Sequence, residues 1–227
     1  MTQAMQDKRQ ETVAVVLAAG AGTRFGSQKL LAELHGRPVL WHALDALRGL
    51  ELEARYVVVG AEAERVAASV EAWCAAADLP LNYFRILTNP LWYEGMATSL
   101  HAAAGIDCDW MLVVLGDQPF VGTAHLHALF DARDAALTEG APLDAVASRY
   151  EDRVAVPALL SCHLAPRLLA LRGDTGAREI LRMPEEGGRV RTVPLPLTER
   201  HADIDTQQDL AWFRAVPSAR DLPHPDA

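Results

Sequence analysis

The chain has 227 residues, half of them hydrophobic, and a formal net charge of −9 at pH 7. This length suits one domain, or one domain with small insertions, and it supplies enough apolar residues for a full core. The acidic balance argues against a nucleic-acid backbone as the partner, because that kind of binding relies on clustered lysine and arginine.

Cysteine usage and the chain ends bear on location. Cys74, Cys108 and Cys162 are odd in number and show no Cys-x-x-Cys spacing. This predicts neither a zinc site nor a disulfide framework, and it fits a reducing, cytoplasmic location. The first twelve residues are polar and no apolar run reaches membrane-spanning length, so neither a signal peptide nor a transmembrane segment is expected. Flexible ends are predicted at 1–12 and 216–227, around one domain at 13–215.

The first predicted element is a buried strand over Val13–Ala18, whose residues are apolar and mostly β-branched. A loop at 20–29 follows, and its glycines permit sharp turns and close approach to a ligand. The same loop carries two cations, Arg24 and Lys29. Backbone N–H groups after a strand, together with cations, are suited to binding phosphates.

This loop fits neither of the commonest phosphate-binding fingerprints. A dinucleotide-binding loop beginning at Gly20 would need a glycine where Phe25 stands, and a Walker loop would need Gly-Lys-Ser/Thr, whereas Lys29 follows Gln28. Residues 17–29 instead read Leu-Ala-Ala-Gly-x-Gly-x-Arg-x-Gly-x-x-Lys. The alternative interpretation is a glycine-rich surface turn with two solvated cations.

Strands and helices alternate over the next part of the chain. Pro38 begins a helix whose apolar residues recur three and four apart, and Tyr56–Val59 is a second strand. A helix with an apolar face at 63–73 and a third strand at Asn82–Leu87 follow. This alternation predicts a three-layer, doubly wound, mostly parallel α/β sheet of the Rossmann-like kind, with ligands bound at the carboxyl ends of the strands.

Two segments after the third strand are candidates for ligand binding. Gly95 permits an unusual turn before a small-residue helix, and Ser99 can donate a hydrogen bond near the start of that helix; an ordinary loop and cap is the alternative. Trp110–Leu115 is a fully apolar strand that ends in a Gly-Asp-Gln-Pro turn containing Asp117. A carboxylate at the carboxyl end of a central parallel strand, beside a phosphate loop, is well placed to hold Mg²⁺. A plain turn aspartate before proline is the alternative.

The elements predicted after residue 120 do not alternate as regularly between strand and helix. They are a helix from Thr123 to about Leu137, a strand at Asp144–Ser148, an extended segment at Val154–Leu160, a helix at Arg167–Arg172 and a strand at Val190–Val193. Pro157 indicates an edge or irregular position for its strand. Gly173–Arg178 opens a short helix whose start either binds an anion or forms a plain turn and cap.

Two aspartates precede the last predicted helix. If Ala202–Ile204 is extended, Asp203 and Asp205 point to the same side. Thr206 and Asp209 have the spacing of a capping box for that helix, so Asp205 can belong to its turn. Asp203 is therefore favoured over Asp205 as a metal ligand, and the choice between them stays open.

Several separated motifs now occur in the order of one family. They are the opening loop, Asn-Pro-x-x-x-x-Gly-Met-x-x-Ser at 89–99, Gly-Asp-x-Pro at 116–119, Gly-Asp-x-Gly-Ala-Arg at 173–178 and Asp-Ile-Asp-Thr-x-x-Asp at 203–209. Together they resemble the MobA-like NTP transferases, and most of all the molybdenum-cofactor cytidylyltransferases of the MocA type, over roughly residues 13–215. The resemblance implies the fold of the nucleotide-diphospho-sugar transferases.

The resemblance also implies roles for individual residues. Arg24, Lys29 and Asp117 would be catalytic, and Asp117 and Asp203 would bind Mg²⁺. The implied nucleotide- and cofactor-binding residues are Leu17, Ala18, Ala19, Gly20, Gly22, Gly95, Met96, Ser99 and Arg178. Alanine at both 18 and 19 favours cytidine over guanosine.

The implied activity is transfer of CMP from CTP to the phosphate of molybdenum-molybdopterin, with release of pyrophosphate and with Mg²⁺ as cofactor. The implied partners are CTP or another NTP, a phosphorylated acceptor such as molybdopterin and, transiently, a molybdenum hydroxylase; neither a nucleic acid nor a membrane is expected. The alternatives are GTP-dependent transfer to the molybdenum cofactor, transfer to a sugar-1-phosphate or to methylerythritol phosphate, and an accessory protein that binds nucleotide or cofactor without turnover.

Overall fold

The structure is a computed structural model that describes residues 10–151, 153–182, 190–195 and 203–216. The flexible ends predicted at 1–12 and 216–227 lie outside these residues except at 10–12 and 216, and the first strand already begins at Thr12. Within this described part, no helix combines the length and the apolar content that crossing a membrane requires.

Seven strands form one sheet in the order β5-β4-β1-β6-β8-β7-β9. Their bounds are β1 (Thr12–Ala18), β4 (Ala54–Val59), β5 (Arg85–Thr88), β6 (Trp110–Leu115), β7 (Ala145–Arg149), β8 (Val154–Ser161) and β9 (Val190–Pro194). Strand β8 runs antiparallel to both its neighbours, and the other pairs are parallel. The predicted mostly parallel α/β sheet is therefore confirmed.

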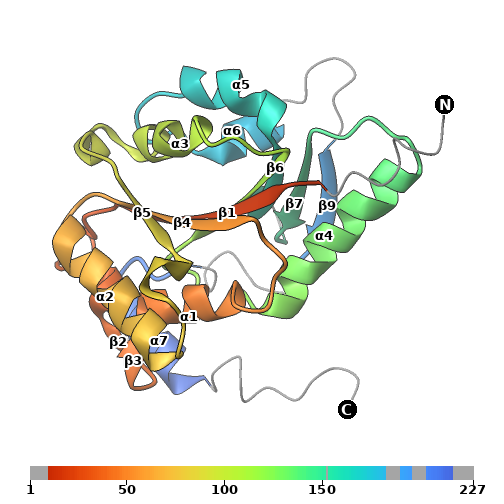
Figure 1. Ribbon diagram of the computed structural model, residues 1–227. Helices are drawn as coiled ribbons and strands as arrows, with labels where there is room; N and C mark the ends of the chain where they lie inside the picture. Colours follow the sequence, from red (N-terminus) through yellow and green to blue (C-terminus); the bar gives the residue numbers. More distant parts are fainter. Residues whose placement is uncertain (1–9, 152, 183–189, 196–202, 217–227) are drawn as a thin grey trace, which may run out of the picture.

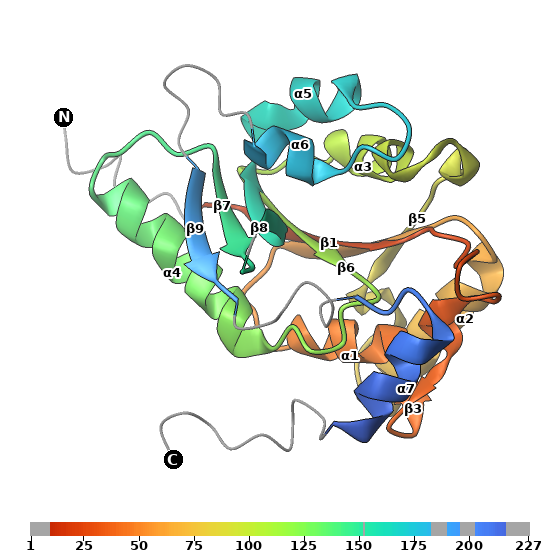
Figure 2. The ribbon, with the colours of Figure 1, turned by 180° about the vertical axis from the view of Figure 1, so that it is seen from behind.

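Helices cover both faces of this sheet (Figures 1 and 2). One face carries α3 (Met96–Ala104), α5 (Ala165–Ala170) and α6 (Ala177–Arg182), and the other carries α1 (Val39–Ala46), α2 (Ala63–Ala76) and α4 (Thr123–Thr138). Helix α7 (Gln207–Ala215) lies on the same side as α1 and packs against Leu34 and Phe25. The shorter elements are a pair of strands, β2 (Glu33–Leu34) and β3 (Arg37–Pro38), and the 3₁₀ turns η1 (Lys29–Leu31), η2 (Leu81–Tyr83), η3 (Trp92–Glu94) and η4 (Cys162–Leu164).

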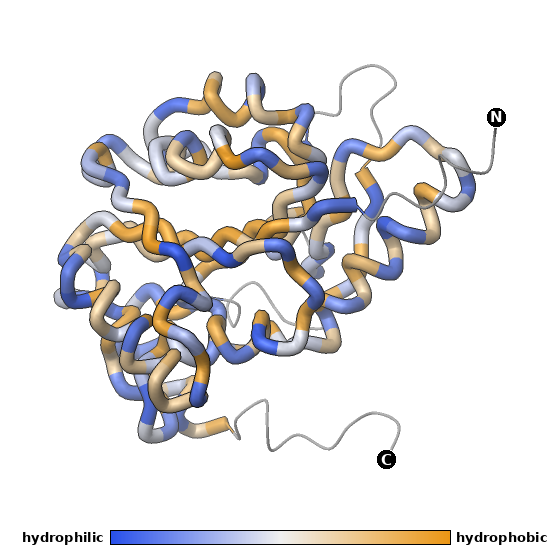
Figure 3. The backbone as a smooth tube through the Cα atoms, in the orientation of Figure 1, coloured by the Kyte–Doolittle hydropathy of each residue, from blue (hydrophilic) through white to orange (hydrophobic). Residues whose placement is uncertain are grey.

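Strand β1 shows why the chain forms three layers. Val13 and Val15 pack into the cluster that includes α3, α5 and α6, whereas Ala14 and Val16 pack into the cluster that includes α1, α2 and α4. Successive side chains of a strand point to opposite faces, so a strand buried on both faces needs an uninterrupted apolar run. Figure 3 shows this apolar layer through the middle of the molecule. The buried strand in turn fixes the direction in which the following loop leaves the sheet.

Two strand predictions need correction. The strand predicted at Asn82–Leu87 begins only at Arg85, because Tyr83 N–H donates to the Pro80 carbonyl at 2.9 Å and closes a 3₁₀ turn. Strand β8 lies inside the sheet and not at its edge, but it is irregular as predicted: Ala147 pairs with Ala158 while Ser148 pairs with Ala155. The two residues between, one of them the proline, have no partners in this ladder.

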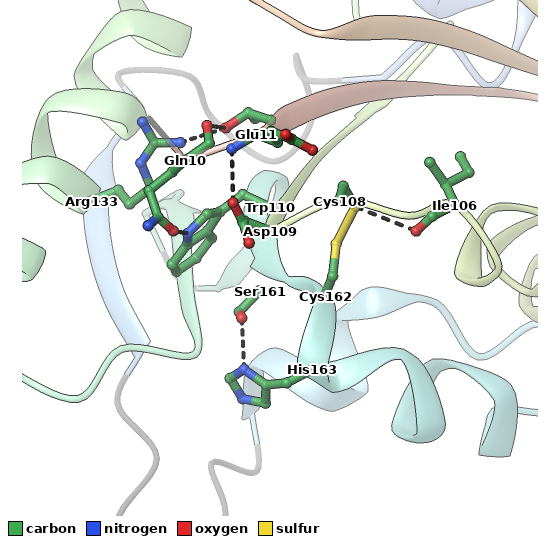
Figure 4. Close-up of a disulfide and its surroundings, with 11 residues drawn as sticks. Gln10, Glu11, Ile106, Cys108, Asp109, Trp110, Arg133, Ser161, Cys162 and His163 are labelled. Carbon is green, nitrogen blue, oxygen red and sulfur yellow. Dashed lines mark hydrogen bonds between the residues drawn. A yellow bond between two sulfur atoms is a disulfide. The ribbon is translucent and has the colours of Figure 1, made fainter. Parts of the chain in front are cut away.

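The prediction that no disulfide forms is wrong. Cys108 and Cys162 are bonded, with their Cα atoms 6.2 Å apart (Figure 4). Cys74 is free and buried. Cys108 precedes β6 and Cys162 follows β8, and the antiparallel pairing of these strands places Trp110 opposite Ser161. The alternation of strands and helices predicted a mostly parallel sheet without indicating which strands would pair antiparallel, so the sequence offered no reason to bring these two cysteines together.

Candidate functional site

A cavity of about 520 Å³ lies at the carboxyl ends of β1 and β6. The predicted site residues that line it are Leu17, Ala18, Ala19, Gly20, Arg24, Lys29, Gly95, Met96, Ser99, Asp117 and Asp203. Ala21, Thr23, Leu30, Trp92, Tyr93, Leu115, Asp174 and Asp205 complete the lining. The tertiary structure thus gathers segments that are spread over almost the whole chain around one open space.

The glycine-rich loop is held in shape by its own backbone and by one buried amide. Gly22 has φ +62°, and its carbonyl accepts hydrogen bonds from the N–H groups of Phe25 and Gly26 at 2.9 and 3.0 Å. Gln28, 4% exposed, donates from Nε2 to the carbonyls of Gly20 and Ala61, both at 3.2 Å. These bonds set the path of the loop before any ligand binds, and no sequence pattern indicated this role of Gln28.

The loop is also anchored to the end of the chain. The buried side chain of Phe25 packs in one apolar cluster with Ile204, Leu210 and Phe213, and Gln207 Nε2 donates to the Phe25 carbonyl at 3.3 Å. The predicted capping box of Thr206 and Asp209 is present at the start of α7. This packing brings the segment at 203–205 alongside the loop.

Lys29 lies at the centre of the charged groups in the cavity. Its Nζ is 2.5 Å from Asp117 Oδ2 and 2.9 Å from Asp205 Oδ1, and its side chain is only 14% exposed. Burial alone would lower the pKa of Lys29, but the charges and hydrogen bonds of Asp117 and Asp205 outweigh burial and raise it. The lysine is therefore a fixed positive charge between two carboxylates.

Asp205 bridges both loop cations. Besides its bond to Lys29, its Oδ2 lies 3.1 Å from Arg24 Nη2. Burial would raise the pKa of Asp205, but the two cations lower it. One carboxylate thus occupies the donors that a phosphate group would use, and both cations are already directed at a single anion.

The pKa of Asp203 is shifted in the opposite direction to that of Asp205. Its pKa is raised to about 6, first because the group is buried and next because Asp117 is close, while Gln118 and Arg153 oppose the rise. The backbone ties the two aspartates together, since Ile204 N–H donates to the Asp117 carbonyl at 3.1 Å. Asp203 is therefore a carboxylate whose charge the surrounding residues compensate only in part.

This donor set fits a divalent cation. Four carboxylates, Asp117, Asp174, Asp203 and Asp205, face two cations in the cavity lining, a formal excess of two negative charges. A polyphosphate entering such a cavity needs further positive charge, and carboxylate oxygens are the ligands that Mg²⁺ prefers. The described residues hold no group of three or more His, Cys, Asp or Glu arranged for a metal. One or two carboxylates suffice, however, where a substrate phosphate supplies other ligands.

The turn between α5 and α6 docks on the start of α3. Gly95 has φ +110°, and a Cβ there would collide with the Gly173 carbonyl. Ala97 N–H donates to that carbonyl at 3.0 Å, and Asp174 lines the cavity next to it. Ser99 is buried and its Oγ accepts from Asn89 Nδ2 at 3.1 Å. The turn at Gly173–Asp174 therefore packs directly against the start of α3 at the wall of the cavity.

Two predicted site residues do not line the cavity. Gly22 shapes the loop without facing the space, and Arg178 lies on α6. The Arg178 Nε atom is buried and finds no hydrogen-bond partner among the described residues. Sequence reasoning missed Trp92 and Tyr93 on η3, the second of them 66% exposed. Two adjacent aromatic residues inside the motif at 89–99 were the available signal.

Comparison with known proteins identifies a family model, related sequences and similar folds. The sequence model of the MobA-like NTP transferase domain matches residues 14–190. The chain is similar to bifunctional protein GlmU of Alkalilimnicola ehrlichii, with 40% identity over 125 residues that cover 54% of this chain and 25% of GlmU. The chain thus spans about a quarter of the length of the curated relatives it matches.

Among solved structures, the chain is similar to Rv0371c from Mycobacterium tuberculosis H37Rv, with a TM-score of 0.71 and 25% identity over 91% of this chain and 99% of that one. A manganese complex of the same protein has a TM-score of 0.67 and 24% identity over 91% of this chain and 100% of that one. The fold therefore extends over nearly the full length of both chains.

Proposed function

This chain belongs to the MobA-like NTP transferase family, and from that membership and the cavity we propose that it is a nucleotidyltransferase that moves CMP from CTP to the phosphate of molybdenum-molybdopterin. The observation that carries the proposal is the convergence of Lys29 and Arg24 on one anion, Asp205, beside the carboxylates Asp117 and Asp203. Two directed cations next to acidic oxygens are what binding and reaction of a polyphosphate require.

The proposed reaction forms one P–O bond and breaks another. An oxygen of the acceptor phosphate attacks the α-phosphorus of CTP, and pyrophosphate leaves with the electron pair of the broken bond. The acceptor phosphate is already ionised near neutral pH, so no protein base has to remove a proton. The protein's part is to hold the reactants in line and to neutralise charge, and these two effects account for most of the rate in phosphoryl transfer.

In this proposal Lys29 and Arg24 neutralise the triphosphate once it has displaced Asp205. Asp117 and Asp203 would hold a divalent cation, which supplies further positive charge to the reacting phosphates. The manganese complex of Rv0371c supports a divalent metal in this fold, and Mg²⁺ is the ion we propose. Lys29 would then exchange its contact with Asp205 for one with phosphate and keep its contact with Asp117.

The base and the acceptor would bind on either side of these charges. Ala18, Ala19, Gly95, Met96 and Ser99 line the space proposed for cytosine, where the two alanines and the glycine leave room for the ring. Arg178 is proposed on the acceptor side, because the turn that precedes its helix contacts the start of α3 and contributes Asp174 to the cavity lining. A transient complex with the molybdenum hydroxylase that receives the cofactor also belongs to the proposal.

Pyrophosphate release by the purified protein tests the proposal. Mg²⁺ and molybdenum-loaded molybdopterin are supplied, and CTP, GTP, ATP and UTP are added one at a time. Release with CTP alone is the expected result. Release with GTP instead would retain the reaction and refute the choice of base, and release only with a sugar-1-phosphate or methylerythritol phosphate would refute the acceptor. Nucleotide binding without pyrophosphate release in the presence of any of these acceptors would favour an accessory protein.

A further inference from the structure

The buried side-chain amide of Gln118 lies next to Asp117 and Asp203, the two carboxylates proposed to hold the divalent cation. Gln118 follows Asp117 in the chain and is only 2% exposed. Its Nε2 donates to Asp203 Oδ1 at 2.7 Å and to Tyr150 Oη at 3.1 Å. The nucleotide-binding roles proposed above make no use of this side chain, although it is one of the few buried polar residues in the described part of the chain.

The orientation of the Gln118 amide follows from its neighbours. Tyr150 Oη donates its single proton to the Val156 carbonyl at 2.7 Å, so towards Gln118 it can only accept. Ionised Asp203 can also only accept. Both neighbours therefore require the NH₂ group, and the Gln118 Oε1 atom is left buried without a partner in the described chain. An orphaned oxygen of this kind is unfavourable, and the two bonds from the NH₂ group offset it.

Tyr150 is itself held rigidly. It is 1% exposed, and its N–H donates to the Arg153 carbonyl at 2.9 Å within the turn that joins β7 to β8. Burial raises the pKa of Tyr150, so its hydroxyl keeps its proton throughout the physiological range. The Arg153 guanidinium lies over the Tyr150 ring, 5.0 Å from its centre, with Nη2 3.8 Å from Asp203 Oδ2. The β7–β8 turn thus reaches the back of the site through two side chains.

We infer that Gln118 and Tyr150 are positioning residues, which fix the carboxylate of Asp203 beside Asp117 through the chain of hydrogen bonds Val156 C=O, Tyr150 Oη, Gln118 Nε2 and Asp203 Oδ1. This inference rests on the proposed function, because it takes Asp203 as a ligand of the divalent cation. With Oδ1 held from behind, the remaining oxygen lone pairs of Asp203 are available to the cation. Partners that orient a metal ligand in this way commonly change metal affinity 10- to 100-fold when they are replaced.

Manganese binding by the full chain tests the inference without turnover. The affinity for Mn²⁺ is measured by electron paramagnetic resonance, without and with CTP and in the absence of any acceptor, for the wild type and for Asp203→Asn, Gln118→Met, Tyr150→Phe and the Gln118→Met/Tyr150→Phe double variant. Methionine keeps the size of glutamine but donates no hydrogen bond. We expect Gln118→Met to weaken Mn²⁺ binding about 10-fold or more, and Tyr150→Phe to weaken it by a smaller factor.

The double variant separates positioning from a general loss of stability. If Tyr150 acts on Asp203 only through Gln118, the double variant binds Mn²⁺ within about twofold of Gln118→Met alone, because coupled residues are not additive. Thr12→Val is the matched control. It also removes a buried hydrogen bond, to Arg133 Nη1 at 2.7 Å, but at the opposite end of β1. Its Mn²⁺ affinity is expected to stay at the wild-type value.

The outcomes distinguish failure of the positioning inference from failure of the proposed metal site. If wild-type binding depends on Asp203 but Gln118→Met binds Mn²⁺ as tightly as the wild type, the inference is refuted and the proposed function is untouched. Additive losses in the double variant, or an equal loss in Thr12→Val, would likewise refute it. If the wild type binds no Mn²⁺ either with or without CTP, or if Asp203→Asn binds it as well as the wild type, the metal site of the proposed function is refuted and the inference with it.

Discussion

Replacing Lys29 with methionine tests two effects of its positive charge, one on the stability of the fold and one on the rate of the proposed reaction. Lys29 Nζ lies within 3 Å of Asp117 and Asp205, and the lysine and Asp117 side chains are 14% and 15% exposed. Removing one member of a buried ion pair costs about 3 kcal/mol or more. Because Asp205 is about one-third exposed, solvent screens part of that interaction, and we expect the free energy of unfolding to fall by about 2–3 kcal/mol. A domain of ordinary stability remains folded after such a loss.

The same substitution removes positive charge from the proposed triphosphate site. A fixed donor directed at charge that develops in the transition state is worth about 10²–10³ in kcat. We expect pyrophosphate release to fall by at least this factor. Denaturant unfolding followed by circular dichroism gives the stability, and a coupled pyrophosphate assay gives the rate.

Arg37→Met is the matched control for Lys29→Met. Arg37 Nη1 lies 2.6 Å from Asp45 Oδ2 in another partly buried ion pair, and neither residue lines the cavity. This variant should lose some stability and keep the wild-type rate. A folded Lys29→Met protein that turns over at the wild-type rate would refute the assignment of Lys29 to the phosphates.

Three further predictions concern other parts of the fold. Gly95→Ala is expected to destabilise the chain by at least about 1–3 kcal/mol and to raise the KM for CTP, because φ is +110° and the new Cβ meets the turn between α5 and α6; an unchanged melting temperature would contradict this. Burial lowers the pKa of His125 to about 4, and its Nε2 lies 2.7 Å from Ser148 Oγ. As the pH falls, the unfolded chain therefore protonates at His125 before the folded chain does. The free energy of unfolding is unaffected by this group above about pH 6.5. It falls as the pH approaches 4, by about 2 kcal/mol after allowance for partial exposure. Denaturant midpoints of His125→Gln between pH 4 and 8 should show a shallower slope than the wild type, and parallel curves would be evidence against it. Reduction of Cys108–Cys162, which are 54 residues apart, should lower the free energy of unfolding by up to about 4 kcal/mol in the chain-entropy picture, and an unfolding midpoint that dithiothreitol leaves unchanged would count against that value.

Local patterns were enough to predict the framework of this protein. An apolar run followed by glycines and two cations predicted β1 and its loop, and an apolar strand ending in Gly-Asp predicted β6 and Asp117. The carboxyl ends of parallel strands meet at one edge of a sheet, so these two segments could be placed together before the structure was known. The capping box of Thr206 and Asp209 was equally local, because its hydrogen bonds join residues three apart.

Tertiary structure alone decided how the charges of the site are paired. The bond between Lys29 and Asp205 joins residues 176 apart in sequence, and that between Gln118 and Asp203 joins residues 85 apart. Sequence reasoning favoured Asp203 over Asp205 for a metal but gave no sign that Asp205 would hold both loop cations. The antiparallel direction of β8, and with it the disulfide of Cys108 and Cys162, was also beyond local patterns. Such contacts depend on which strands become neighbours when the whole core packs, and hydrophobic periodicity specifies the face that a residue occupies but not the residue it will meet there.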